Sequence, residues 1–427
     1  MNSAEADAAS VRPRIRDDLV VGPALLRGDK YVHVIKDPVS GQLMTVGERE
    51  HFIVSRLDGE HSLADISAKY RTRFGRVLDD RAWGSIMATL AGRSLLAGMN
   101  PEQRAVSTNA SEPNTLLHAR LPLFRPDRRL GRLADRMSWA FTPVFTVTAM
   151  IVVLVTLAII AQNLPVLARS ALGLWERPWL GVLALVILWG VVAMHEVGHG
   201  LAAKHFGARV GEIGIRWRFP LVAPYCSVEE IQLLPGRHRV RIAFAGVFVS
   251  LLALPPMVLL WWGAPEGGTV HTLTSGLVLF GTVTALVNFV PFLRLDGYAM
   301  VNHALGTENL ARDSTSHVVA WSKSLVRRAA PAPRPPRWAR NAYLAYALLA
   351  TVFHTTLAAL VAWWWFALLE HLYGAWVAVS ILLVTAVLIT AVYRIVAVRQ
   401  RRRASNTPGV HHEKHRTRRR FTNKERR

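Results

Sequence analysis

Apolar residues along this chain gather into six long runs separated by polar, mostly basic segments. Each run is long enough for a helix to cross about 30 Å of hydrocarbon. We therefore predict a mainly α-helical, polytopic membrane protein with about six transmembrane helices. The runs extend over residues 138–162, 178–206, 241–263, 270–292, 342–369 and 374–398.

The first hundred residues have a different pattern, which is typical of a small domain outside the membrane. Residues 31–36 alternate in polarity like a strand, and the alternation resumes at 42–46 after a turn. Three amphipathic helical stretches follow, at 48–57, 63–74 and 80–92. This order predicts a small α+β winged-helix domain over residues 18–99, after a polar N-terminus, residues 1–17, that we expect to be disordered.

The remaining segments divide by composition. Residues 100–137 combine a Ser, Asn, Thr and Pro-rich linker with a basic amphipathic stretch, 128–136, which is typical of a helix at a membrane surface. The six apolar runs define a membrane domain over residues 138–398. Residues 399–427 form a basic tail with 12 Lys/Arg against 2 Asp/Glu, a composition that favours contact with anionic lipid over nucleic acid.

The distribution of charge predicts how the chain crosses the membrane. The net charge is +22, and outside the tail most of it lies in loops between the apolar runs. The second and fourth connections carry 7 and 8 Lys/Arg, whereas the first, third and fifth contain only Arg169 and Arg177. By the positive-inside rule, both termini and the two basic connections are cytosolic, so we expect a multi-pass protein of the cell (inner) membrane.

The second apolar run contains the string His195-Glu196-Val197-Gly198-His199. Residues four apart share a helix face, so both imidazoles face one point while the carboxylate lies about 100° around the helix. Two neutral nitrogen ligands with a nearby carboxylate are typical of zinc peptidases. The alternative is a pair of buried histidines satisfied by backbone carbonyls. Because the chain has one cysteine, Cys226, a Cys-based zinc cluster is excluded.

A third ligand is predicted from the order of the spans. The second and fourth runs end on the same side of the membrane, and the fourth is followed by Asp296. Pro291 and Gly297 allow the backbone to leave regular helix there. Asp296 is therefore the expected third ligand, although it is also placed to orient one of the histidines from outside the metal shell.

The motifs in these two runs together resemble the site-2 protease family of intramembrane zinc metalloproteases. The second motif is Asn288-x-x-Pro291-x-x-x-x-Asp296-Gly297. The resemblance covers roughly residues 178–305, and Arg294 departs from the commonest family pattern. It implies that Zn²⁺ is bound by His195, His199 and Asp296, that Glu196 activates water, and that Asn288 hydrogen-bonds the substrate.

The N-terminal domain resembles the leader-peptide recognition domains, PqqD-like winged helices, of ribosomal-peptide biosynthesis. The resemblance lies in Leu26-Arg27-Gly28-Asp29-Lys30-Tyr31, in the stretch from Leu57 to Ile66, and in the order of strands and helices. It implies that an extended leader peptide adds a strand to the sheet. A purely scaffolding domain is the alternative. DNA binding is disfavoured because Asp79 and Asp80 begin the third helical stretch.

The second connection, residues 210–232, alternates weakly and carries Gly211, Gly214 and three aromatic residues. It is consistent with a re-entrant hairpin that offers an edge to an extended substrate, and equally with an interfacial loop anchored by aromatics.

These features predict a zinc endopeptidase that removes the leader from a ribosomally made, modified peptide at the cytosolic side of the membrane. The whole arrangement resembles the membrane metalloproteases of daptide-type peptide clusters. The expected partners are a peptide precursor bound through the N-terminal domain and membrane lipid, with no nucleic acid. Two alternatives stay open: a site-2-type protease acting on a membrane-tethered regulator, and a non-catalytic peptide or metal transporter.

Overall fold

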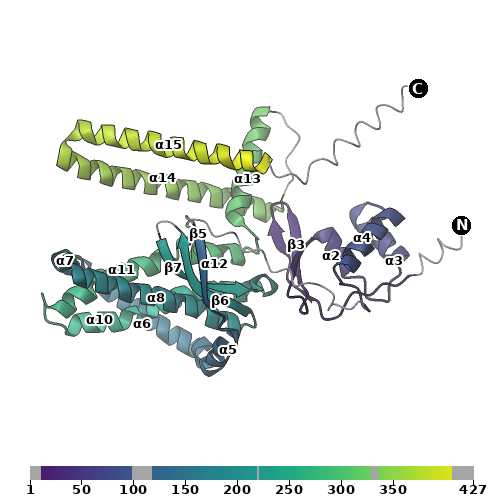
Figure 1. Cartoon of the computed structure of the whole chain (residues 1–427), viewed down its shortest axis with the longest axis horizontal. Helices are drawn as coiled ribbons and strands as arrows, with labels where there is room; N and C mark the ends of the chain where they lie inside the picture. The colour runs from purple at the N-terminus through teal and green to yellow at the C-terminus, as the bar shows by residue number, and fades with distance from the viewer. Residues whose placement is uncertain (1–10, 99–117, 219–220, 328–334, 406–427) are drawn as a thin grey trace. The chain divides into compact units, whose positions relative to one another are not determined.

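The computed structural model describes residues 11–98, 118–218, 221–327 and 335–405 (Figure 1). The chain divides into two compact units, Met1–Leu348 and Leu349–Arg427. Our predictions for residues 1–10, for the part of the linker before residue 118 and for the tail beyond residue 405 lie outside the described residues. Residues 11–17, which we expect to be disordered, are instead held by bridges from Arg14 to Asp58 and from Ile15 to Leu96.

The N-terminal domain is built around one central strand. β3 (Lys30–Lys36) pairs antiparallel with β4 (Leu43–Gly47) on one side. On its other side it pairs with β1 (Val20–Val21) and β2 (Leu25–Arg27). The outer edge of β4 therefore has no strand partner among the described residues.

Three helices follow the sheet, as the sequence predicted: α2 (Glu48–Val54), α3 (Leu63–Phe74) and α4 (Asp80–Gly92). The starts of α3 and α4 are fixed locally, since the Ser62 hydroxyl and the Asp65 carboxylate form a capping box at α3 and Asp79 caps α4. The helices share a core with Ile35 of β3. The alternate residues Val32, Val34 and Lys36 are buried as well, so both faces of this sheet are covered.

Five helices in the described part of the chain are long and apolar enough to cross a membrane. The sixth predicted run is also helical, within α15 (Ala375–Ser405), but its apolar part within the described residues covers only Ala375–Thr385. Six crossings therefore remain a prediction. The five are α6 (Pro143–Gln162), α8 (Pro178–His205), α9 with α10 (Gly236–Gly263), α11 (Thr269–Val287) and α14 (Arg337–Tyr373).

The third predicted run is not one continuous helix. It divides into α9 (Gly236–Leu252) and α10 (Leu254–Gly263), because Pro255 and Pro256 occupy the first turn of α10, where the missing N–H groups cost nothing. The fourth run, predicted to extend to residue 292, leaves regular helix at Val287. The chain then turns irregularly before α12 (Asp296–Ala304) and α13 (Leu310–Arg327).

A three-stranded sheet accompanies the membrane helices, and the sequence predicted only part of it. β6 (Arg209–Arg218) and β7 (Leu221–Glu229) form the hairpin considered for the second connection. The third strand, β5 (His118–Phe124), pairs with β6 and precedes the basic helix α5 (Asp127–Arg136). The sequence predicts a linker for these residues, so this strand is a correction. A further unpredicted helix, α7 (Leu164–Glu176), fills the first connection.

The N-terminal domain contacts the segment around α12 and α13 through the turn between β2 and β3. Leu26 forms a parallel bridge with Thr307, and its side chain is fully buried with Leu310 and Tyr343. The Gly28 N–H donates to the Asp313 carboxylate at 2.9 Å. Burial raises the pKa of the Asp313 carboxyl, and this hydrogen bond opposes the rise.

The second unit contains the rest of α14 and α15, joined at Gly374. The φ of Gly374 is 86°, in the left-handed region that favours glycine. This turn lets the two helices run in opposite directions (Figure 1).

We predict that Leu26→Ala destabilises the protein by about 2–5 kcal/mol, because it empties a site in which the leucine is 0% exposed. Thermal unfolding of the purified full-length protein measures the effect. Val77→Ala is the control, since Val77 is 70% exposed and its truncation should leave the transition unchanged. An equal shift for both variants would contradict the burial of Leu26 against α13.

Candidate metal centre

Three predicted ligands meet where α8 and α12 approach each other. His195 and His199 lie one turn apart on α8, and Asp296 is the first residue of α12. Asp296 Oδ2 lies 2.9 Å from His195 Nε2, and Oδ1 lies 3.3 Å from His199 Nε2. The ligand atoms of all three residues fall within 4.8 Å of one another. The sequence therefore identified three side chains that the fold brings together.

The hydrogen bonds of the two imidazoles suit a metal site. His199 Nδ1 lies 2.7 Å from the carbonyl oxygen of Ile242, which only accepts hydrogen bonds, so Nδ1 carries the proton and Nε2 presents a lone pair. His195 Nδ1 is held by the Ser250 hydroxyl at 2.9 Å. The two Nε2 atoms then face each other 3.1 Å apart, an arrangement in which a shared cation satisfies both.

Asp296 presents an oxygen that lacks a donor. Its Oδ2 is buried and accepts no hydrogen bond of acceptable geometry from the described residues, although His195 Nε2 is near. A buried anionic oxygen without a donor is costly. Two imidazole nitrogens and one carboxylate are also the donor set that Zn²⁺ prefers in catalytic sites. On both grounds the residues fit a divalent metal.

Gly246 on α9 provides the space for this cluster. A Cβ at this position would collide with the Nε2 atoms of both His195 and His199. Neither Gly246 nor Ser250 was identified from the sequence, because both belong to α9 and carry no metal-binding motif. The pattern that would have revealed them is their spacing: Ile242, Gly246 and Ser250 follow one another at four-residue intervals and share a helix face.

Glu196 lies beside the cluster on α8, and its carboxylate accepts a hydrogen bond from the β-sheet. The backbone N–H of Cys226, on β7, donates to Glu196 Oε2 at 2.9 Å. Burial, followed by the charge of Glu196, raises the pKa of the Cys226 thiol to about 12. The thiol is therefore neutral at physiological pH.

Asn288 has a structural role in this conformation. Its side-chain amide donates to the backbone carbonyl of Thr284, one turn earlier in the same helix. The backbone carbonyl of Asn288 accepts a hydrogen bond from the Gly297 N–H at 2.6 Å. A Cβ on Gly297 would collide with the backbone of residues 288 and 289. Gly297 thus allows the close turn that brings the neighbouring Asp296 to the histidines.

The comparisons with known proteins give one informative likeness. The chain is 25% identical over 144 residues to a "putative peptide zinc metalloprotease protein", YydH, of Bacillus subtilis. The match covers 34% of this chain and 54% of that protein, so it spans about half of the relative's length. No family model and no solved structure matches. The likeness supports a membrane metalloprotease. It agrees with the helices that are long enough to cross a membrane and with the histidine–aspartate cluster.

We predict that Gly246→Ala abolishes stoichiometric metal binding, because the added methyl group occupies the space between the two imidazoles. The measurement is the zinc-to-protein ratio of the purified full-length protein by elemental mass spectrometry. Gly263→Ala is the control, since a Cβ there meets no atom within 4 Å. Retention of a full zinc complement by the Gly246 variant would show that the metal does not lie at this cluster.

Proposed function

We propose that this protein is an intramembrane zinc endopeptidase that removes the leader from a ribosomally made, modified peptide at the cytosolic side of the cell membrane. The observation that carries the proposal is the convergence of His195, His199 and Asp296 with the carboxylate of Glu196 beside them. A site for structural or transported metal needs the first three residues but has no need of an additional, separately held carboxylate.

The roles of the residues follow from their positions. His195, His199 and Asp296 would hold Zn²⁺, which would supply Lewis-acid chemistry for the scissile carbonyl and for water near neutral pH. Glu196 accepts the proton of the attacking water and returns it to the leaving amine. The Cys226 N–H holds one oxygen of Glu196 and leaves the other for this transfer. Asn288 is the proposed donor to the substrate, which requires its amide to leave the Thr284 carbonyl.

The β-hairpin offers a way to present an extended peptide. β6 is flanked by β5 and β7, so the outer edge of β7 has no strand partner among the described residues. That edge reaches the reacting groups, because Cys226 on β7 contacts Glu196 directly. A substrate strand added to β7 would expose its peptide bonds, which a helix shields. This supports the hairpin interpretation of the second connection over a simple interfacial loop.

We predict that Glu196→Gln reduces peptide cleavage by about 10²–10⁴-fold, since the amide no longer accepts the water's proton, while zinc binding is retained. Precursor cleavage is followed by mass spectrometry in membranes that contain the full-length protein. Glu266→Gln is the control, because Glu266 lies in the loop between α10 and α11. Full cleavage by the Glu196 variant would reject the protease and favour a transporter that uses the same ligands.

The N-terminal domain is the proposed site of leader recognition. Its sheet has an unpaired edge at β4, and strand addition there needs only backbone groups. The domain is also held against the catalytic part of the chain. Arg27 pairs with Glu308, and the buried Lys36 pairs with Glu230, the residue after β7, at 2.6 Å. A leader bound at β4 would thus be delivered to the site by a fixed domain.

We predict that Leu43→Asp, on the β4 edge, weakens binding of a leader-bearing precursor about ten-fold and leaves hydrolysis of a leaderless peptide unchanged. Leu43 is 47% exposed, so the change removes an accessible apolar contact without disturbing the core. Val20→Asp is the matched control on β1, across β3 from β4, where the valine is 45% exposed. Binding is measured by fluorescence anisotropy with labelled precursor.

Equal loss in the two assays would reject the recruiting role. If binding of the precursor does not depend on its leader, a membrane-tethered regulatory protein becomes the better candidate substrate for the same protease.

A further inference from the structure

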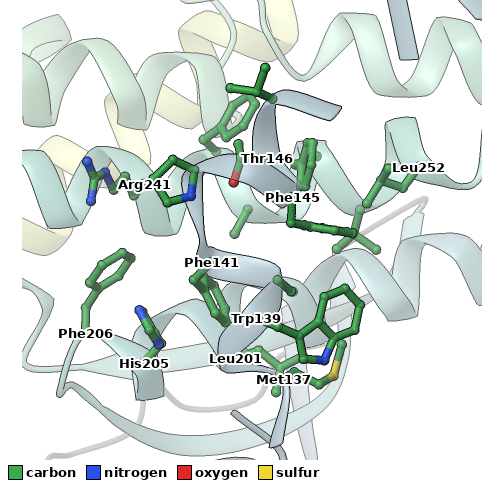
Figure 2. Close-up of a pocket in the computed structure, with 18 residues that line it drawn as sticks. Met137, Trp139, Phe141, Phe145, Thr146, Leu201, His205, Phe206, Arg241 and Leu252 are labelled. Carbon is green, nitrogen blue, oxygen red and sulfur yellow. The ribbon is translucent and has the colours of Figure 1, made fainter. Parts of the chain in front are cut away.

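An apolar cavity of about 490 Å³ lies among η2 (Ser138–Phe141), α6, α8 and α9, apart from the metal ligands (Figure 2). Its wall is mostly apolar and includes six aromatic side chains. Neither His195, His199 nor Asp296 lines it, so a peptide bond held there would not meet the proposed catalytic groups. The aromatic residues of the wall include Trp139, Phe141, Phe145, Phe206, Phe244 and Phe248.

The cavity has the depth of one membrane leaflet. Its lining on α9 runs from Arg241 to Leu252, and the eleven residue steps between them cover about 16 Å of helix. The hydrocarbon core of a bilayer is about 30 Å thick, so this length is about half of it. The cavity therefore fits an extended apolar chain that enters from one surface of the membrane.

The two ends of the cavity differ in charge. Figure 2 shows Arg241, His205 and Phe206 on one side and Leu252 on the opposite side. Arg241 is exposed and forms no hydrogen bond or ion pair within the described residues; its guanidinium lies 6.0 Å from the Phe206 ring centroid. The described lining contains no acidic side chain. The free positive charge thus lies at the basic, predicted cytosolic end of α8 and α9, where anionic headgroups are found.

We propose that this cavity binds one acyl chain of an anionic phospholipid, with the lipid phosphate at Arg241. The apolar wall and leaflet depth select the chain, and the unpaired guanidinium selects the phosphate. Two of the helices that form this wall are α8, which carries both histidines, and α9, which orients them. Gly198 lines the cavity, and its Cα lies so close to α9 that an added Cβ would come within 2.8 Å of Val249. A lipid bound here would support the packing of α8 on α9.

The test is photolabelling of the full-length protein in phosphatidylcholine vesicles that contain a minor fraction of phosphatidylglycerol with a diazirine in its acyl chain. Labelled peptides are mapped by mass spectrometry. We expect label on segments that contain Phe145 and Phe248, and much less from a phosphatidylcholine probe with the same chain. Arg241→Gln should lower the labelling about five-fold, since one basic residue near an anionic headgroup contributes about that factor.

Two variants complete the design. Arg237→Gln removes a charge one turn earlier on α9, outside the lining, and should leave the labelling unchanged. Ala140→Trp fills the cavity and should abolish labelling of Phe145 and Phe248. Equal labelling by both lipid probes, or unchanged labelling in the Arg241 variant, would overturn the proposal. Displacement of the lipid label by the precursor peptide would also overturn it and assign the cavity to an apolar part of the substrate.

Discussion

The close approach of α9 to α8 is the constraint on which the rest of this site depends. At Gly246 the absence of a side chain leaves room for two imidazole nitrogens 3.1 Å apart. On the same face of α9, Ile242 and Ser250 supply a carbonyl and a hydroxyl that fix the outer nitrogens. α9, which contributes no residue to the histidine–aspartate cluster, therefore orients both histidines, and it determines which ring nitrogen of His199 carries no proton.

The carboxylates of Asp296 and Glu196 are positioned near the histidines by different structural elements. Asp296 comes from beyond the end of α11, and its position depends on a backbone turn in which Gly297 donates to the Asn288 carbonyl. Glu196 belongs to α8 itself, but its orientation depends on a strand, through the Cys226 N–H. The site thus joins two membrane helices, one irregular turn and one β-hairpin, and a change in any of them alters the geometry of the histidine–aspartate cluster and of Glu196.

The sequence predicted the parts of this arrangement that follow from the spacing of residues within a single helix. The four-residue spacing of His195 and His199 and the apolar runs are properties of single helices, and loop charge indicated that Asp296 ends on the same side as the histidines. It did not predict β5, because the partner of this strand lies about 90 residues later in β6, and the Pro122 within it argues against a strand. Gly246 and Ser250 were missed for a related reason. Their spacing places them on one face of α9, but only the packing of α9 against α8 shows that this face contacts the two histidines.

The ion pair between Lys36 and Glu230 explains why the N-terminal domain is more than a tethered module. Both side chains are nearly buried, at 7% and 13% exposure, and their charged atoms lie 2.6 Å apart. Removing one member of such a pair leaves an uncompensated buried charge, which costs about 3–5 kcal/mol. Separation of the domain from the hairpin would expose both charges to water and lower this cost, so the pair by itself adds little net stability.

The effect of the Lys36–Glu230 pair is on geometry: while the domain is docked, only one register places Lys36 against the residue that follows β7. The same strand that ends at Glu229 contacts Glu196 through Cys226. The Lys36–Glu230 pair therefore connects β3, the partner strand of β4, to the residue that follows β7, whose Cys226 holds the Glu196 carboxylate.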